Sequence, residues 1–132
     1  SARILTEHLD FHLNKILTAV DPQKTYDVLE TIGMPFRDQV TFVRTAPYYI
    51  EAIPVGTSKA SGLSNVCKGL GIDSSEVIAF GDAENDLEMI QFAGHGVAMG
   101  NAKDDVKQTA DYITASVDED GIAKALKHFG VI

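Results

Sequence analysis

The chain has 132 residues, of which 45% are hydrophobic, so it can form the packed core of one ordinary domain. Nineteen acidic and eleven basic side chains give it a formal net charge of −8 at pH 7. This charge would repel a phosphate backbone, and no block of lysine and arginine is present to attract one, so we expect no nucleic-acid partner.

No apolar stretch reaches the length of about 18 residues that a membrane span needs, and no leader sequence is recognisable. We therefore expect no membrane association and no signal peptide. The single cysteine, Cys67, belongs to an apolar series with Leu63, Val66 and Leu70. This spacing predicts a place in a helix core rather than a nucleophile or half of a disulfide. A reducing, cytoplasmic setting is expected.

The first part of the chain, up to about residue 51, is predicted to be an α+β unit. Asp21 can cap a helix that has Pro22 at its first position and Gly33 just past its end, the favoured order of start and stop residues. Ala46 and Pro47 separate two stretches rich in β-branched and aromatic residues, which indicates a hairpin or a bulged pair. The predicted elements are helices over residues 3–14 and 22–32 and strands over residues 15–20, 40–44 and 48–53.

After a break at residues 54–56 the pattern becomes a regular alternation of helix and strand. Ser58 or Thr57 can cap a helix that Gly71 closes, and Gly94 can close a later helix. The predicted elements are helices over residues 59–70, 84–93, 102–109 and 119–129 and strands over residues 77–80, 96–99 and 111–114. Repeated strand-helix units predict an α/β fold with a parallel sheet covered by helices.

Polar side chains follow the buried strand predicted over residues 77–80. Asp82, Glu84, Asn85 and Asp86 come after the glycine that ends the apolar run. Ligands bind at the carboxyl ends of strands in open α/β sheets, and carboxylate oxygens suit Mg²⁺, so this is a candidate magnesium site. Asp82 could equally cap the helix that it starts by accepting hydrogen bonds from the helix amides. The local pattern leaves both interpretations open.

Lys59 stands at a predicted helix start, where the helix already carries partial positive charge. A lysine there is useful if it and the helix amides jointly hold an anion such as phosphate; the alternative is an exposed lysine with no such role. Asp86 could hold a metal-bound water or orient Lys59, and Asn85 offers an amide donor to a phosphate oxygen. Asn101 follows the next predicted strand and is most simply explained as a helix cap.

Several segments carry a family resemblance. They are residues 49–59, which end in Lys59, residues 77–86, residues 96–102 with the sequence Gly-Val-Ala-Met-Gly-Asn-Ala, and residues 110–121. These segments resemble the carboxyl-terminal half of the haloacid dehalogenase superfamily, and within it the Cof-type branch of phosphatases. The resemblance implies that residues 52–132 are the carboxyl-terminal half of a Rossmann-like core and that residues 1–51 are part of an α+β cap domain.

By that resemblance the polar residues take definite roles. Lys59 would bind the substrate phosphate and shield the charge of the nucleophile, and Asn85 would contact the same phosphate. Asp82 would be the Mg²⁺ ligand and Asp86 a second carboxylate supporting the metal shell, so the implied catalytic residues are Lys59, Asp82 and Asp86. The resemblance further implies a Mg²⁺-dependent phosphatase of small phosphorylated metabolites that works through an aspartyl-phosphate intermediate.

The nucleophile motif of this family, an apolar strand followed by Asp-x-Asp, has no counterpart in these 132 residues, because Asp118 and Asp120 follow no buried strand. We therefore expect the chain alone to be inactive, although its parent protein would be an enzyme. The alternatives are a non-catalytic regulatory or interaction module on the same scaffold and a phosphomutase or sucrose-phosphatase relative. Without the nucleophile strand, residues 77–80 would have an unpaired apolar edge, which predicts self-association.

Overall fold

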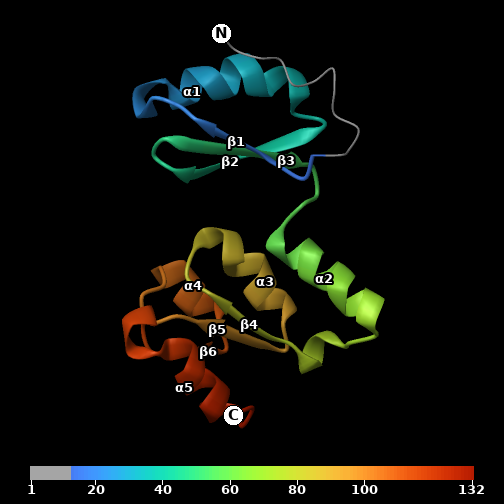
Figure 1. Ribbon diagram of the computed structural model, residues 1–132, viewed down its shortest axis with the longest axis vertical. Coiled ribbons are helices and arrows are strands. Elements are labelled where there is room, and N and C mark those ends of the chain that lie inside the picture. Colours follow the sequence, from blue (N-terminus) through green and yellow to red (C-terminus); the bar gives the residue numbers. More distant parts are fainter. Residues whose placement is uncertain (1–12) are drawn as a thin grey trace. The chain divides into compact units, whose positions relative to one another are not determined.

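The computed structural model describes residues 13–132 and is drawn as a ribbon in Figure 1. The helix predicted over residues 3–14 therefore lies almost entirely outside the described residues. The described residues form two compact units, which divide between Thr57 and Ser58. None of the described helices combines the length and the apolar character that a membrane span requires.

The first unit contains a three-stranded antiparallel sheet in the order β1-β3-β2. Its strands are β1 (Ile16–Ala19), β2 (Val40–Ala46) and β3 (Tyr49–Pro54). The pairing register of β2 and β3 shifts between Arg44 and Ala46, so the predicted bulged hairpin is confirmed. The Arg44 guanidinium donates to the carbonyl oxygens of Ala46 at 3.4 Å and Pro47 at 3.1 Å, and these bonds hold the turn.

A helical segment of mixed type links β1 to β2. It consists of a 3-10 turn (Pro22–Lys24), α1 (Thr25–Val28), a π-helical turn (Leu29–Gly33) and a second 3-10 turn (Met34–Phe36). The Asp21 carboxylate accepts a hydrogen bond from the backbone N of Gln23 at 3.0 Å, which confirms the predicted cap. The prediction that Gly33 ends the helix is wrong, because its φ of −73° and ψ of −44° are helical. A Cβ there would lie 3.2 Å from the Phe42 ring, so the glycine permits close packing instead.

The second unit contains a three-stranded parallel sheet in the order β4-β5-β6, which confirms the predicted α/β class. Its strands are β4 (Ile78–Gly81), β5 (His95–Ala98) and β6 (Tyr112–Ile113), and its helices are α2 (Lys59–Leu70), α3 (Leu87–Phe92), α4 (Asp104–Thr109) and α5 (Gly121–His128). Three 3-10 turns join them at Ser74–Glu76, Glu84–Asp86 and Val117–Glu119. Figure 1 shows α3 above the sheet and α5 below it.

Small residues on the sheet let α3 approach closely. A Cβ at Gly96 in β5 would lie only 2.5 Å from the carbonyl oxygen of Ile90 in α3. Ile90 is 1% exposed and belongs to a buried cluster whose other members are Ala98, Met99, Ala102 and Val106. Cys67 in α2 is buried with a free thiol, which confirms its predicted place in the core.

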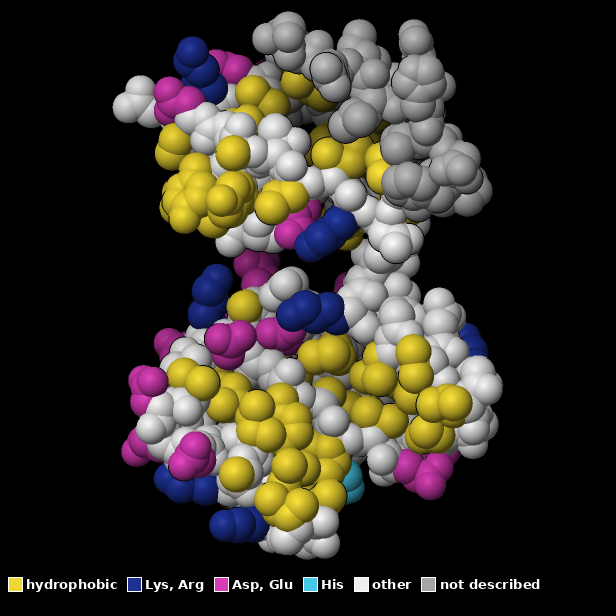
Figure 2. All heavy atoms as spheres, viewed as in Figure 1, with side chains coloured by type: hydrophobic (Ala, Val, Ile, Leu, Met, Phe, Trp, Pro, Cys, Tyr) yellow, Lys and Arg dark blue, Asp and Glu magenta, His cyan; other side chains and the backbone are white. Residues whose placement is uncertain are grey.

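β4 is an edge strand of the described sheet, because its hydrogen-bonded neighbour there is β5 alone. Ile78 and Phe80 in β4 are partly exposed. Figure 2 shows apolar side chains over α2 and near the carboxyl terminus. The other large hydrophobic side chains that are exposed in this unit are Val66, Leu70, Ile72, Ile113, Val117, Ile122, Val131 and Ile132. The second unit thus presents both an open strand edge and apolar surface on which another polypeptide can pack.

Candidate active site

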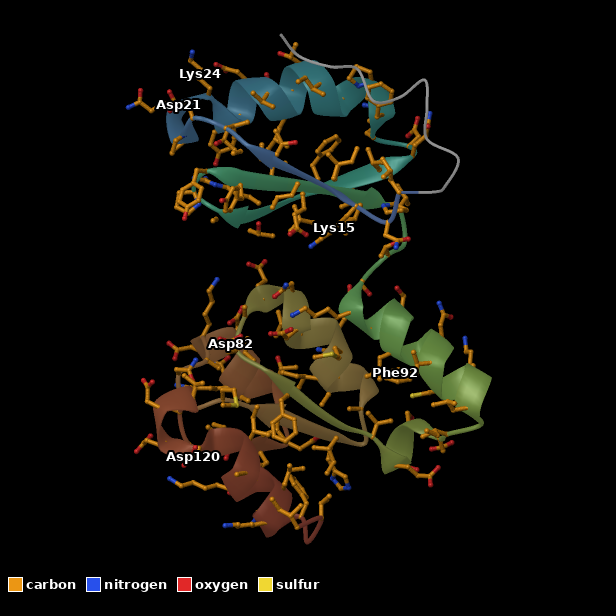
Figure 3. All side chains as sticks on the ribbon, viewed as in Figure 1. Lys15, Asp21, Lys24, Asp82, Phe92 and Asp120 are labelled. Atoms are coloured by element: carbon orange, nitrogen blue, oxygen red, sulfur yellow. The ribbon has the colours of Figure 1, made fainter. Side chains whose placement is uncertain are left out.

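The candidate site residues lie around the carboxyl end of β4, where Figure 3 shows Asp82. Lys59 is the first residue of α2, and Ser58 is the N-cap of that helix. Ser58 Oγ accepts from the backbone N of Ser61 at 3.1 Å, and Ser61 Oγ accepts from the backbone N of Ser58 at 2.8 Å. This capping box confirms one of the two predicted caps and fixes the backbone that carries Lys59.

Asp86 is the buried polar residue of the site, with 3% exposure. Its Oδ1 accepts a charged hydrogen bond from Lys59 Nζ, and its Oδ2 accepts from the backbone N of Asp82 at 3.0 Å and of Ala83 at 3.1 Å. Burial alone would raise the pKa of Asp86, but the hydrogen bonds from Lys59 and the two amides outweigh it and hold the pKa below its usual value. Asp86 is therefore ionised at neutral pH and orients Lys59.

Asp82 presents an exposed carboxylate directly after β4. The alternative that Asp82 caps the next helical turn is wrong. Ala83 is the N-cap of the turn Glu84–Asp86, and the carboxylate that accepts the amide hydrogen bonds there belongs to Asp86. Oδ2 of Asp82 lies 3.4 Å from Nδ2 of Asn101, and the rest of the carboxylate is accessible to a ligand.

Asn85 and Glu84 belong to the same 3-10 turn as Asp86, and both side chains are exposed. The amide of Asn85 is accessible to a ligand, and its backbone is fixed by the turn that buries the neighbouring Asp86. Glu84 lies in the first turn, where its negative charge interacts favourably with the positive end of a helix. The turn thus combines one buried anchor with an exposed amide.

The prediction that Asn101 caps a helix is wrong, because Lys103 is the N-cap of α4. A backbone turn after β5, closed by the hydrogen bond from the N of Ala102 to the carbonyl oxygen of Met99, places the start of α4 further along the chain. Asn101 instead contacts Asp82 through Nδ2, and its Oδ1 accepts from the backbone N of Val117 at 3.0 Å. Sequence reasoning missed these contacts, although parallel strands bring their following loops to the same edge of a sheet.

The donors at the site fit a magnesium ion held largely by water. Mg²⁺ typically takes one or two protein carboxylates and completes its octahedron with waters and phosphate oxygens. The exposed carboxylate of Asp82 fits as a direct ligand. Both oxygens of Asp86 already accept hydrogen bonds, so Asp86 fits a supporting place behind that ligand. Within residues 13–132 no group of three or more His, Cys, Asp or Glu side chains could hold a metal ion by itself.

Comparison with known proteins identifies the family. Residues 2–126 match the family model of the haloacid dehalogenase-like hydrolases. The chain is 47% identical over 103 residues to the 5-amino-6-(5-phospho-D-ribitylamino)uracil phosphatase YcsE of Bacillus subtilis, an alignment that covers 78% of this chain and 41% of the relative.

Two solved structures show the same fold. A haloacid dehalogenase-like hydrolase from Bacteroides thetaiotaomicron matches with a TM-score of 0.89 and 39% identity, over 97% of this chain and 48% of that one. The subclass IIB sugar phosphatase BT4131 matches with a TM-score of 0.71 and 38% identity, over 89% of this chain and 44% of that one. The chain therefore spans less than half the length of these relatives. The match over nearly the whole chain confirms the resemblance, and the chain belongs to the haloacid dehalogenase-like hydrolases.

Proposed function

We propose that this chain forms one wall of the active site of a Mg²⁺-dependent phosphatase whose substrates are small phosphorylated metabolites. The ion pair of Lys59 and Asp86, next to the exposed carboxylate of Asp82, is the observation that carries the proposal. The names of the related phosphatases support the reaction class. In this proposal residues 52–132 are half of the catalytic core and residues 1–51 are part of a cap domain.

Each residue then has a task that requires a fixed position more than intrinsic reactivity. Lys59 neutralises a phosphate oxygen, and Asp86 holds the ammonium group of Lys59 in place. The Asn85 amide donates to a second phosphate oxygen. Asp82, with Asp86 behind it, holds the cation; when bound, Mg²⁺ would neutralise charge on the transferring phosphoryl group.

The attacking group must come from outside the 132 residues. The family resemblance implies that an aspartate attacks phosphorus as the bond to the leaving oxygen breaks, that a second aspartate protonates that oxygen, and that water then hydrolyses the aspartyl phosphate. Asp118 and Asp120 do not fit these roles, because they lie in and after an exposed 3-10 turn several residues beyond β6 and not directly at the end of a strand. We therefore expect the chain alone to release no phosphate.

A chimera tests the proposal. The part of YcsE that this chain does not match would be fused ahead of residue 1, and phosphate release from an aryl phosphate would be measured with and without Mg²⁺. We expect the chimera to be active only with Mg²⁺ and the isolated chain to be inactive. A chimera that folds but has no activity would favour the non-catalytic module, and phosphoryl transfer without phosphate release would favour the phosphomutase relative.

Matched variants of the chimera assign the activity to the site. Lys59→Met and Asp82→Asn should each abolish turnover, because they remove the phosphate and metal partners. Lys68→Met and Asp104→Asn are the controls, because both residues are exposed and lie in the same unit. Equal losses in site and control variants would contradict the assigned roles. If the isolated chain turned over substrate and Asp82→Asn abolished that turnover, the proposed inactivity of the isolated chain would be refuted.

The open edge of β4 supports a proposal about partners. An unpaired strand that carries partly exposed Ile78 and Phe80 can pair with the same strand of a second copy, so we expect the isolated chain to self-associate.

The buried, unpaired Cys67 favours a reducing, cytoplasmic location for the protein.

A further inference from the structure

Three loops follow the carboxyl ends of β4, β5 and β6. The side chain of Asn101, in the middle loop, contacts the loops on both sides. Asn101 lies in the loop after β5. Its Nδ2 donates to Oδ2 of Asp82, in the loop after β4, across 3.4 Å. Its Oδ1 accepts from the backbone N of Val117, beyond β6, across 3.0 Å. One amide group therefore joins all three loops.

Backbone contacts fix the loop that carries Asn101 relative to both neighbours. The backbone N of Lys103 donates to the carbonyl oxygen of Asp82 at 3.2 Å, and the backbone N of Gly100 donates to the carbonyl oxygen of Ala115 at 3.0 Å. A Cβ at Gly100 would lie 2.6 Å from the backbone N of Ser116, so the close approach requires glycine. The backbone on either side of Asn101 is thus held to the Asp82 loop and to the loop after β6.

The chemistry of these contacts determines how the Asn101 amide is turned. The backbone N–H of Val117 needs an acceptor, and the Asp82 carboxylate needs a donor. Only one orientation of the amide satisfies both groups, because the oxygen must face Val117 and the nitrogen must face Asp82. The bond from Val117 therefore presents the amide hydrogens to Asp82.

We propose that Asn101 is a positioning residue that holds the Asp82 carboxylate ready for its cation. The proposal rests on the proposed function of Asp82 as a metal ligand. Asp82 is exposed, so without a partner its side chain would sample several rotamers and would lose that freedom when it binds. Asn101 engages Oδ2 and leaves Oδ1 accessible. Asp86 performs the same kind of task for Lys59.

A titration with Mg²⁺ alone, followed by the backbone amide NMR signals of Ala83 and Asp82 in the full chain, tests the proposal. Asn101→Ala should weaken Mg²⁺ binding about three- to tenfold, the range expected for loss of one hydrogen bond to a ligand. Asn65→Ala, at an exposed position of α2, should leave binding unchanged. Binding by Asn101→Ala that is as tight as in the unaltered chain would overturn the proposal.

A second variant separates positioning from a merely structural role. Val117 is the first residue of its 3-10 turn, where proline is well tolerated, and its side chain is exposed, so the main effect of Val117→Pro is to remove the N–H that orients Asn101. We expect Val117→Pro to weaken Mg²⁺ binding less than Asn101→Ala does, and the double variant to bind like Asn101→Ala alone. Fully additive losses would show that the two residues act separately and would overturn the proposed relay.

The two proposals can fail independently. If the unaltered chain binds no Mg²⁺, the metal role of Asp82 in this chain is refuted. The contact itself is then judged without metal, from the side-chain NH₂ signals of Asn101. We expect these signals to shift in Asp82→Ala and to stay in place in Asp104→Ala, an exposed position of α4. Unshifted signals in Asp82→Ala would overturn the positioning role.

Discussion

Asp86 should be the polar side chain on which the stability of the second unit depends most. Asp86→Ala removes an acceptor for two backbone amides and the partner of Lys59. A hydrogen bond to a charged group contributes about 1.5 kcal/mol or more, so the two amide bonds together contribute about 3 kcal/mol. The side chain of Lys59 is 48% exposed, so its ion pair adds no more than about 1 kcal/mol. The expected loss is about 3–4 kcal/mol.

Asp86→Asn separates these contributions. The amide oxygen of asparagine can still accept from the backbone N of Asp82 and Ala83, whereas its NH₂ group would face the Lys59 ammonium. We therefore expect a loss of about 1–2 kcal/mol, from the ion pair and from the weaker hydrogen bonds that a neutral acceptor makes. Asp104→Ala, at an exposed position in the first turn of α4, is the control and should cost less than about 1 kcal/mol.

Native-state hydrogen exchange measures these losses in the second unit alone, which matters because the chain has two compact units. The amide of Val97 in the middle strand β5 is the one to follow, since this residue is 0% exposed. Equal losses for Asp86→Asn and Asp86→Ala would refute the reasoning, because they would assign the stability to the ion pair. A loss below about 1 kcal/mol for Asp86→Ala would refute it as well.

Three further predictions concern the same unit. Because the pKa of Asp86 is lowered in the folded state, its contribution to stability is complete above the usual carboxyl pKa of about 4 and is lost as pH falls through the lower folded pKa. Acid unfolding of Asp86→Ala should lack this pH-dependent loss, and a pH profile identical to that of the unaltered chain would contradict the prediction. Gly96→Ala should lower the free energy of unfolding by about 1–3 kcal/mol by forcing α3 from the sheet, whereas Gly69→Ala, with open space around it, should not lower it. Hydrogen exchange measures both changes, and equal values for the two variants would contradict the prediction. Ile78→Lys on the edge strand should reduce the self-association seen by sedimentation velocity, while Val66→Lys on α2 should not, and a monodisperse unaltered chain would contradict the expectation.

The sequence predicted those parts of the fold that are determined locally. Ser58 and Gly71 show why, because the first closes a capping box at the start of α2 and the second takes a left-handed φ of 69° at its end. The predictions that Gly33 ends a helix and that Asn101 caps one are wrong. Each residue is of a type typical of a helix end, but each makes a tertiary contact instead. Gly33 packs on Phe42, and Asn101 bonds to Val117.

The site shows the same division between local and distant information. The identities of Lys59, Asp82, Asn85 and Asp86 were predicted from the motif, but the direction of each side chain depends on tertiary contacts. Asp86 turns back onto the amides of Asp82 and Ala83 and is buried, whereas the Asp82 side chain accepts no helix amide and stays exposed. No local pattern indicated this arrangement, since both carboxylates have the residue type that caps a helical turn.

The capping box at the start of α2 also determines to which unit Lys59 is fixed. The two units divide between Thr57 and Ser58, so Lys59 is only one residue beyond the boundary. Ser58 nevertheless forms reciprocal hydrogen bonds with Ser61, so the backbone at Lys59 is held within the first turn of α2. Gly56, with its left-handed φ of 78°, lies before Ser58 and belongs to the first unit. Lys59 is therefore mechanically part of the same unit as Asp82 and Asp86, so the spacing of these three charges is a property of the second unit by itself.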